Sequence, residues 1–283
     1  MLAIQPSLIV TTYNRPDALK RVLLALAQQQ AIALQTLEII VADDGSRVET
    51  AYLIQQLQKT LPYRLVHSWQ TDDGFRAGMA RNRAVAKATG NYCIFLDGDC
   101  IPRPDFVAQH IKLAEVGYFV AGNRVLLSER FTQAVLQDRM IIPQHFWTWW
   151  RTYWQGDINR LLPLYPLPMP TYWRKRYLDR WQGAKTCNLA VWRTDFLAVN
   201  GFDEQFQGWG HEDADLVVRL IRAGIKRKDG RFAVPVLHLW HPEQDRSQEP
   251  ANIARLQAIL ATKTTVATVG VNQYLPSPPV SET

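Results

Sequence analysis

Short apolar runs alternate with amphipathic segments over the first 125 residues of the chain. Four runs have the length and apolar character of buried strands: residues 7–12, 37–42, 63–68 and 92–96. Three segments between them have the pattern of helices: residues 16–26, 48–57 and 76–88. This alternation predicts an α/β fold with a doubly wound, mainly parallel sheet and helices on both of its faces.

The second half of the chain is less regular. We expect strands at residues 184–192 and 231–237, and helices at residues 193–199, 212–223 and 252–260. A chain of 283 residues with 47% hydrophobic and 20% charged residues has the composition of an ordinary globular protein. We therefore expect one domain over residues 1–270, made of a first half (1–125), an insertion (146–185) and a second half (186–262), and then a disordered tail (271–283).

Polar loops follow the expected strands, which is where α/β sheets collect their ligands. Asp97 and Asp99 come directly after the apolar run 92–96. Paired carboxylates at the mouth of a site suit a hard divalent cation that holds phosphate oxygens. An isolated Asp-x-Asp is more often an acidic turn. In this chain, three other polar loops after expected strands favour the cation site over the turn: residues 12–15, 43–46 and 72–76.

The net charge of +6 fits nucleic acid, anionic lipid or phosphate-bearing ligands. Single-stranded nucleic-acid binding is disfavoured, because acidic loops would line the face that a polyanion must occupy. We therefore expect no nucleic-acid partner. A nucleotidyltransferase would need a glycine-rich, lysine-bearing phosphate loop near its first strand, and the sequence has none there.

Three cysteines without CxxC spacing do not form a disulfide framework, so a reducing compartment is expected. The sequence shows no apolar stretch of the roughly 18 residues that a spanning helix needs, and no signal-peptide pattern at its start. The expected location is the cytoplasm, with peripheral attachment to the inner face of a membrane as an alternative.

Several stretches together resemble glycosyltransferase family 2, whose members are inverting nucleotide-sugar enzymes of the GT-A fold. The stretches are residues 10–15, 41–46, 73–76, 80–82, 95–99, 201–204 and 208–213. The last of them is similar to the carboxy-terminal motif of galactosyltransferases and chondroitin polymerases. The resemblance covers about residues 7–241 and leaves the insertion unexplained.

The resemblance implies a UDP-sugar donor bound over the first half of the sheet. Tyr13 and the backbone near Thr11 would face the uracil, and either Asp43 or Asp44 would accept a hydrogen bond from its N3–H group. The alternative for the stretch 43–46 is a plain turn, since Asp, Gly and Ser are ordinary turn residues.

Two arginines are candidates for the donor's phosphates or its sugar, because guanidinium groups pair well with phosphate oxygens. They are Arg76 and Arg81; for both, the alternative is a solvated helix face. The candidate donor-binding residues are Thr11, Tyr13, Asn14, Arg15, Asp43, Asp44, Gly74, Arg76, Arg81, Asp97 and Gly98.

The resemblance also implies a Mn²⁺ or Mg²⁺ cofactor. Asp99 is the first candidate ligand, and Asp97 would contact the ribose or a metal-bound water. His238 or His241 would complete the site, because imidazole suits Mn²⁺ and both follow an expected strand. Each has a purely structural role as its alternative. Their spacing of three residues is expected to place both on one side only if the segment is helical.

The resemblance makes Asp213 the general base that deprotonates the acceptor hydroxyl. Glu212 would hold hydroxyls of the acceptor or the donor sugar, while Trp209 forms an apolar platform and Gly210 allows close approach. The alternative for the two acids is helix capping, because acids are common in a first helical turn. A second alternative is a non-catalytic sugar-binding relative. Galactose or N-acetylgalactosamine is preferred as donor sugar, on the 208–213 resemblance alone.

The insertion at 146–185 holds six tryptophans, four tyrosines and seven basic residues against two acids. Its four prolines predict two short helices joined by a proline-rich loop. Three interpretations remain open: an acceptor groove that stacks on sugars, a contact with a membrane surface, and a packed subdomain with a basic exposed side. A saccharide or lipid-linked saccharide acceptor fits the first two.

Overall fold

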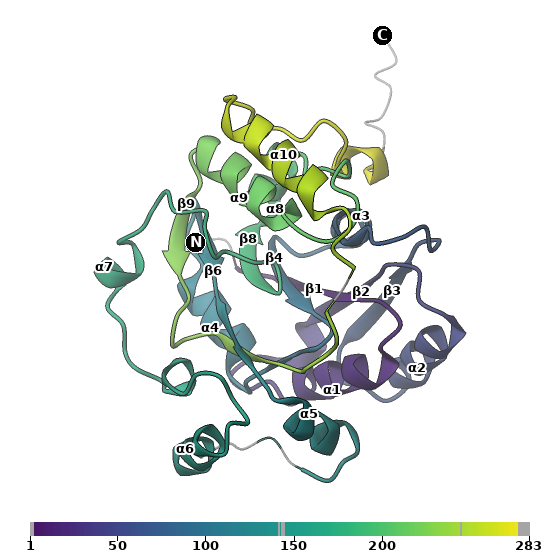
Figure 1. Ribbon diagram of the computed structural model, residues 1–283, viewed down its shortest axis with the longest axis vertical. Coiled ribbons are helices and arrows are strands. Elements are labelled where there is room, and N and C mark those ends of the chain that lie inside the picture. Colours follow the sequence, from purple (N-terminus) through teal and green to yellow (C-terminus); the bar gives the residue numbers. More distant parts are fainter. Residues whose placement is uncertain (1–2, 141, 143–144, 244, 277–283) are drawn as a thin grey trace.

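The computed structural model of the protein describes residues 3–140, 142, 145–243 and 245–276 (Figure 1). Its main sheet has seven strands in the order β3-β2-β1-β4-β8-β6-β9. β8 is antiparallel to β4 and β6, and all other neighbouring strands in this sheet are parallel. The predicted α/β class with a mainly parallel sheet is therefore confirmed. The strands are β1 Pro6–Thr12, β2 Glu38–Asp43, β3 Arg64–Trp69, β4 Tyr92–Asp97, β6 Tyr118–Ala121, β8 Asn188–Trp192 and β9 Lys226–Asp229.

A second sheet of three strands joins segments that are far apart in the sequence. β10 (Pro235–His238) lies between β5 (Cys100–Pro102), to which it is antiparallel, and β7 (Asn123–Leu126), to which it is parallel. His238 is the register partner of Cys100. This pairing brings the end of β10 beside the segment that follows β4.

Helices cover both faces of the main sheet (Figure 1). On one face, Leu19 of α1 packs with Leu8 of β1; on the other, Ala84 of α3 packs with Ile9. Because successive strand residues point to opposite faces, β1 is buried on both sides. The helices are α1 Pro16–Leu26, α2 Val48–Gln58, α3 Ala77–Lys87, α4 Phe106–Leu113, α5 Glu129–Leu136, α6 Phe146–Trp154, α7 Thr171–Arg174, α8 Arg193–Ala198, α9 Glu212–Arg222 and α10 Glu249–Leu260, with 3₁₀ turns η1 Leu34–Thr36, η2 Leu162–Leu164 and η3 Val271–Tyr274.

Two strands expected in the second half are shorter than the sequence suggests. The strand expected at 184–192 begins only at Asn188, whose N–H closes a turn onto the Lys185 carbonyl. The strand expected at 231–237 begins at Pro235, because a turn precedes it in which Phe232 has a left-handed φ of 66°. The sequence pattern missed β9 altogether, since this edge strand is charged at each of its four positions.

The tail expected at 271–283 is ordered at its start, so that part of the expectation is wrong. Val271 is fully buried, and its N–H donates to the Asn200 carbonyl. The Tyr274 hydroxyl donates to Glu204. These contacts hold η3 on the domain, while residues 277–283 lie outside the described part of the chain.

The insertion contains the two short helices that its composition predicts, α6 and α7, on either side of the proline-rich stretch. Among the described residues, no helix combines the length and the hydropathy that crossing a bilayer requires.

Candidate active site

The carboxyl ends of β1, β2 and β4 meet at one edge of the main sheet. Thr11 of β1 is in register with Asp97 of β4, and Thr12 is in register with Asp43 of β2. Residues far apart in sequence therefore reach one edge, as the strand order requires. The ends of these strands and the loops after them carry half of the candidates that the sequence identified.

Asp43 and Asp44 are both buried and both accept hydrogen bonds from the protein. Asp43 accepts from the Ser46 N–H at 2.8 Å and lies 2.7 Å from a ring nitrogen of His67. Asp44 accepts from the Gln70 amide and from the Arg76 N–H, each at 2.7 Å. Burial raises the pKa of Asp44 to about 6. These bonds fix the loop in a single arrangement with a carboxylate at its centre.

The loops around Asp44 are tied to one another. The Tyr13 hydroxyl donates to Asp72 at 3.0 Å, and the Asn14 N–H donates to the Ser46 hydroxyl at 2.9 Å. The Arg76 guanidinium is held by its own loop, where it donates to the Thr71 carbonyl at 2.7 Å. This arrangement leaves Tyr13 half-exposed at the rim, with its ring open to a planar ligand.

Two candidate glycines have different surroundings. The Gly98 N–H donates to the Thr11 carbonyl at 2.7 Å, and a Cβ at position 98 would lie only 2.8 Å from that oxygen. Gly74 has a left-handed φ of 78°, and nothing would touch a Cβ there within 4 Å. Gly98 is therefore required by packing, and Gly74 by backbone conformation.

Asp99 is the centre of a cluster that includes both candidate histidines. Its carboxylate lies 3.7 Å from His238 Nε2 and 3.5 Å from His241 Nε2. The two imidazole rings are 5.1 Å apart. The expectation that both rings reach one side only on a helix is wrong, because they converge at the end of β10 and in the loop beyond it. Arg15 Nη1 also contacts Asp99, at 3.1 Å.

The donor set of this cluster fits a hard divalent cation. His241 Nδ1 lies 2.6 Å from the Pro242 carbonyl and must donate to it, which leaves the Nε2 lone pair facing Asp99. Burial lowers the pKa of His238 to about 4, so its ring is neutral and able to ligate at neutral pH. The Cys100 thiol lies beside this cluster, with its Sγ 3.6 Å from Asp99 Oδ1, and burial raises the pKa of the thiol well above its ordinary value. The carboxylate suits Mn²⁺ or Mg²⁺, and the two imidazoles favour Mn²⁺ over Mg²⁺, which prefers oxygen ligands.

Arg81 lies at the centre of a second cluster and is almost fully buried. Its guanidinium contacts Asp97 at 3.1 Å, Glu212 at 3.4 Å and Asp213 at 3.8 Å. Its Nε donates to the Thr11 hydroxyl at 2.9 Å. The solvated helix face considered for Arg81 is therefore wrong, because α3 turns this side chain into the site.

The carboxylates around Arg81 differ in their ionisation. Burial raises the pKa of Glu212 to about 7 and that of Asp97 to about 6, although Arg81 opposes both shifts. Burial opposes the charge of Arg81 itself, but Asp97, Asp213 and Glu212 together raise its pKa. One cation thus contacts three acids, and burial makes two of them, Asp97 and Glu212, harder to ionise.

Asp213 is the more open of the two acids at the start of α9. Its side chain is 23% exposed, compared with 10% for Glu212. The Thr186 hydroxyl donates a short hydrogen bond to Asp213 Oδ1. The sequence gave no indication of Thr186, which lies 27 residues away in a turn before β8. This contact orients Asp213 while its other oxygen remains available.

The loop before α9 has an unusual backbone. Gly208, Gly210 and His211 have left-handed φ values of 75°, 105° and 74°. A Cβ at Gly210 would meet nothing within 4 Å, so there is open space beside the acids. The ring of Trp209 lies under the Arg246 guanidinium, 4.5 Å away, which fixes the orientation of the indole. Arg246 is another contributor that the sequence did not reveal.

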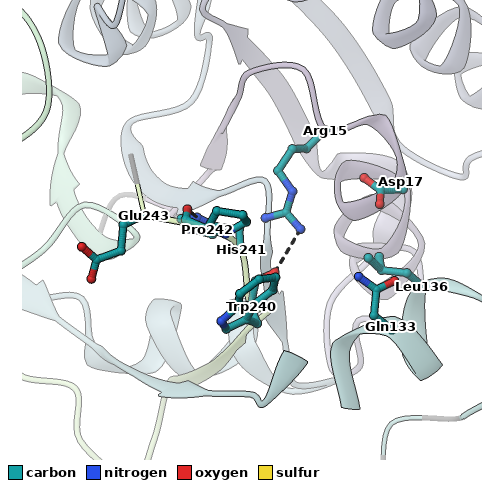
Figure 2. Close-up of a pocket in the computed structure, with 8 residues that line it drawn as sticks. All are labelled: Arg15, Asp17, Gln133, Leu136, Trp240, His241, Pro242 and Glu243. Carbon is teal, nitrogen blue, oxygen red and sulfur yellow. Dashed lines mark hydrogen bonds between the residues drawn. The ribbon is translucent and has the colours of Figure 1, made fainter. Parts of the chain in front are cut away.

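A cavity of about 380 Å³ adjoins the Asp99 cluster (Figure 2). Arg15 reaches across it to the Trp240 carbonyl at 3.4 Å, and His241 forms part of its wall. Gln133 and Leu136 of α5 line the other side, and Asp17 and Glu243 add negative charge. The cluster is thus reachable from solvent on this side.

Comparisons of the sequence with known proteins match it to glycosyltransferases. Residues 7–179 match the model of "Glycosyl transferase family 2", and residues 172–241 match "N-terminal domain of galactosyltransferase". Validoxylamine A glucosyltransferase of Streptomyces hygroscopicus subsp. jinggangensis (strain 5008) is 29% identical over 77% of this chain and 52% of its own. Chondroitin synthase of Escherichia coli is 26% identical over 77% of this chain and 32% of its own. The chain thus spans about half, or less, of the length of these relatives.

Two solved structures share the fold. S. aureus TarS 1–349 in complex with UDP has a TM-score of 0.60 at 14% identity, over 96% of this chain and 68% of its own. The mannosyltransferase PcManGT from Pyrobaculum calidifontis, in complex with GDP-Man and Mn²⁺, has a TM-score of 0.60 at 17% identity, over 93% and 66%. At such low identity the likeness concerns the fold alone.

Proposed function

The chain belongs to glycosyltransferase family 2 and has the GT-A fold, and we propose that it transfers a sugar from a UDP-sugar to a saccharide acceptor with inversion. One arrangement carries the proposal: Asp99 with two histidines, and Asp213 with Arg81, lie at the carboxyl edge of one sheet. The Asp99 cluster suits the diphosphate of a donor, and the Asp213 cluster suits the hydroxyl of an acceptor. The galactosyltransferase match over residues 172–241 favours galactose or N-acetylgalactosamine as the sugar.

The nucleotide fits the loops after β1 and β2. Tyr13 offers its half-exposed ring to the uracil, and Asp43 or Asp44 accepts from the uracil N3–H. A carboxylate oxygen accepts more than one hydrogen bond, so the protein donors already present leave capacity for the base. TarS, which shares the fold, has been solved with UDP.

The diphosphate fits beside Asp99. Asp99, His238 and His241 would hold Mn²⁺ or Mg²⁺, which offsets the charge that develops on the departing diphosphate. Arg15 adds a positive charge at the same place. PcManGT, a fold neighbour, has been solved with Mn²⁺ and a nucleotide-sugar.

Asp213 serves as the base. The acceptor oxygen forms a bond to the anomeric carbon while the bond from that carbon to the β-phosphate oxygen breaks, and UDP leaves with the electron pair. The hydroxyl proton passes to Asp213, whose side chain is the more exposed of the two acids at the start of α9. Glu212, partly protonated near pH 7, is suited to hold a sugar hydroxyl as donor or acceptor. Trp209 supplies an apolar surface for the ring.

The acceptor is a saccharide, free or linked to a lipid. The relatives include a validoxylamine A glucosyltransferase and a chondroitin synthase. A lipid-linked acceptor would bring the insertion to a membrane surface. The alternative, a non-catalytic sugar-binding relative, predicts donor binding without turnover.

Calorimetric titration of the chain with a panel of UDP-sugars and Mn²⁺ tests the donor site. We expect one UDP-sugar to bind, and binding to be lost with a chelator or in Asp99→Asn. Asp213→Asn should bind this donor as the parent does but turn it over about 10²–10⁴-fold more slowly. Binding that is equal with and without metal would refute the metal assignment. Equal turnover in Asp213→Asn would refute the base.

A further inference from the structure

α6 carries a stripe of tryptophans on its outer face. Trp147, Trp150 and Trp154 follow the i, i+3, i+7 spacing of one helical face and are 78%, 47% and 70% exposed. The rings of Trp150 and Trp154 lie 5.5 Å apart. Three exposed indoles on one short helix form a contiguous apolar surface.

The inner face of α6 is already packed, so the stripe is not part of the core. Trp149 and Thr152 are buried, and the Trp149 ring lies 6.4 Å from that of Phe131 in α5. The Thr152 hydroxyl donates to the Thr148 carbonyl. Figure 1 shows α6 at the periphery of the molecule, below the sheet. The helix is thus anchored through one face and presents the other outward.

The segment of chain that carries the stripe exposes charge of one sign. Residues 145–170 include a single acid, Asp157, which is buried and paired with Arg130 at 2.7 Å. Arg151 and Arg160 are exposed in the same stretch, and the whole chain carries +6. A surface that joins indoles to arginines, without an exposed carboxylate over these residues, complements an anionic layer.

We propose that α6 docks the protein on an anionic lipid surface. Trp147, Trp150 and Trp154 enter the boundary between headgroups and acyl chains, where indoles concentrate in membrane proteins. Arg151 pairs with lipid phosphate, as basic residues beside an interfacial helix do. A sugar platform would need several polar groups around each ring, whereas among the described side chains of α6 the exposed polar ones, aromatic residues aside, are Thr148 and Arg151.

Docking through α6 also orients the catalytic edge. α5, against which α6 packs, lines the cavity beside His241 through Gln133 and Leu136. A docked chain therefore presents this cavity close to the lipid surface. The docking goes beyond the proposed function and requires neither donor nor acceptor, so it is measured separately from transfer.

Flotation of the full chain with vesicles tests the docking. One set of vesicles is phosphatidylcholine alone, and the other also contains phosphatidylglycerol. We expect the chain to float with the anionic vesicles, and the triple variant Trp147→Ser, Trp150→Ser, Trp154→Ser to bind them at least about tenfold more weakly. Arg151→Gln should weaken binding by about fivefold, and added salt should weaken the parent similarly.

Tyr52→Ser is the matched control, because Tyr52 is an exposed aromatic residue on α2. It should bind the vesicles as the parent does. The triple variant must retain the parent's thermal midpoint, and Arg151→Gln provides a second test if it does not. The proposal is overturned if the parent chain does not float with anionic vesicles, or if the triple variant and Arg151→Gln both bind these vesicles as the parent does. It is also overturned if the stripe instead mediates a concentration-dependent dimer or binds glycans without lipid.

Discussion

Replacement of Glu212 with glutamine should stabilise the fold at pH 8 and leave its stability almost unchanged at pH 4. Glu212 is buried in the first turn of α9, and burial is the main cause of its raised pKa. The contact with Arg81 at 3.4 Å only partly offsets that effect. Glutamine has the shape of the protonated acid and cannot ionise, so it removes the unfavourable buried charge.

The magnitude follows from the shift in pKa, from 4.5 to about 7. Each pKa unit corresponds to about 1.4 kcal/mol, so ionised Glu212 costs the folded state roughly 3 kcal/mol at pH 8. Because the pKa is higher in the folded state, the favourable contribution is complete below pH 4.5 and is lost as the pH rises through about 7. For a chain of this length, roughly 3 kcal/mol corresponds to about 5 °C in the melting temperature.

Urea unfolding of parent and variant at pH 4, 6 and 8, with chelator present, measures the effect. Glu49→Gln is the matched control, because Glu49 is an exposed acid in the first turn of α2. It should change the free energy of unfolding by less than about 1 kcal/mol at each pH. Two results would refute the conclusion that burial raises the pKa of Glu212. One is a stabilisation by Glu212→Gln that does not grow with pH, and the other is a variant that is less stable than the parent at pH 8.

Three further changes test individual contacts. Thr186→Val removes the donor that orients Asp213, so turnover should fall about tenfold while donor affinity measured by calorimetry stays unchanged. His241→Ala removes a ligand and should lower Mn²⁺ affinity at least about tenfold in a metal titration, with unchanged affinity counting against the site. Gly98→Ala places a Cβ 2.8 Å from the Thr11 carbonyl oxygen and should lower the free energy of unfolding in urea by about 1–3 kcal/mol. An unchanged free energy of unfolding would mean that the loop shifts to make room for the methyl group.

The sequence predicted which loops meet at the carboxyl edge of the sheet, because parallel strands end at the same edge. Once residues 7–12, 37–42 and 92–96 are identified as strands, their following loops must meet, and Asp43 and Asp97 do lie together there. The family resemblance and the enzyme class predicted from these loops are confirmed by the family match. Local patterns of this kind need no knowledge of distant contacts.

Contacts that depend on side-chain direction were not predictable. Nothing near Thr186 indicates that its hydroxyl meets Asp213, because the turn before β8 and the start of α9 are joined only by the fold. The two histidines converge without a helix because β10 pairs with β5, a three-residue strand that has no periodic signal. β9 escaped detection because an edge strand of four charged residues looks like a surface loop.

The two clusters of the site are coupled through Asp97. It is two residues from Asp99 in the chain, and its carboxylate contacts Arg81, which also contacts Glu212 and Asp213. A change of charge at Asp99 therefore alters the field at Asp97 and, through Arg81, the field at the base. Because Arg81 and Glu212 are largely shielded from water, the coupling is stronger than a similar arrangement on the surface would give. Under the proposed function, we therefore expect donor binding at the Asp99 cluster to change the electrostatics of proton removal at Asp213.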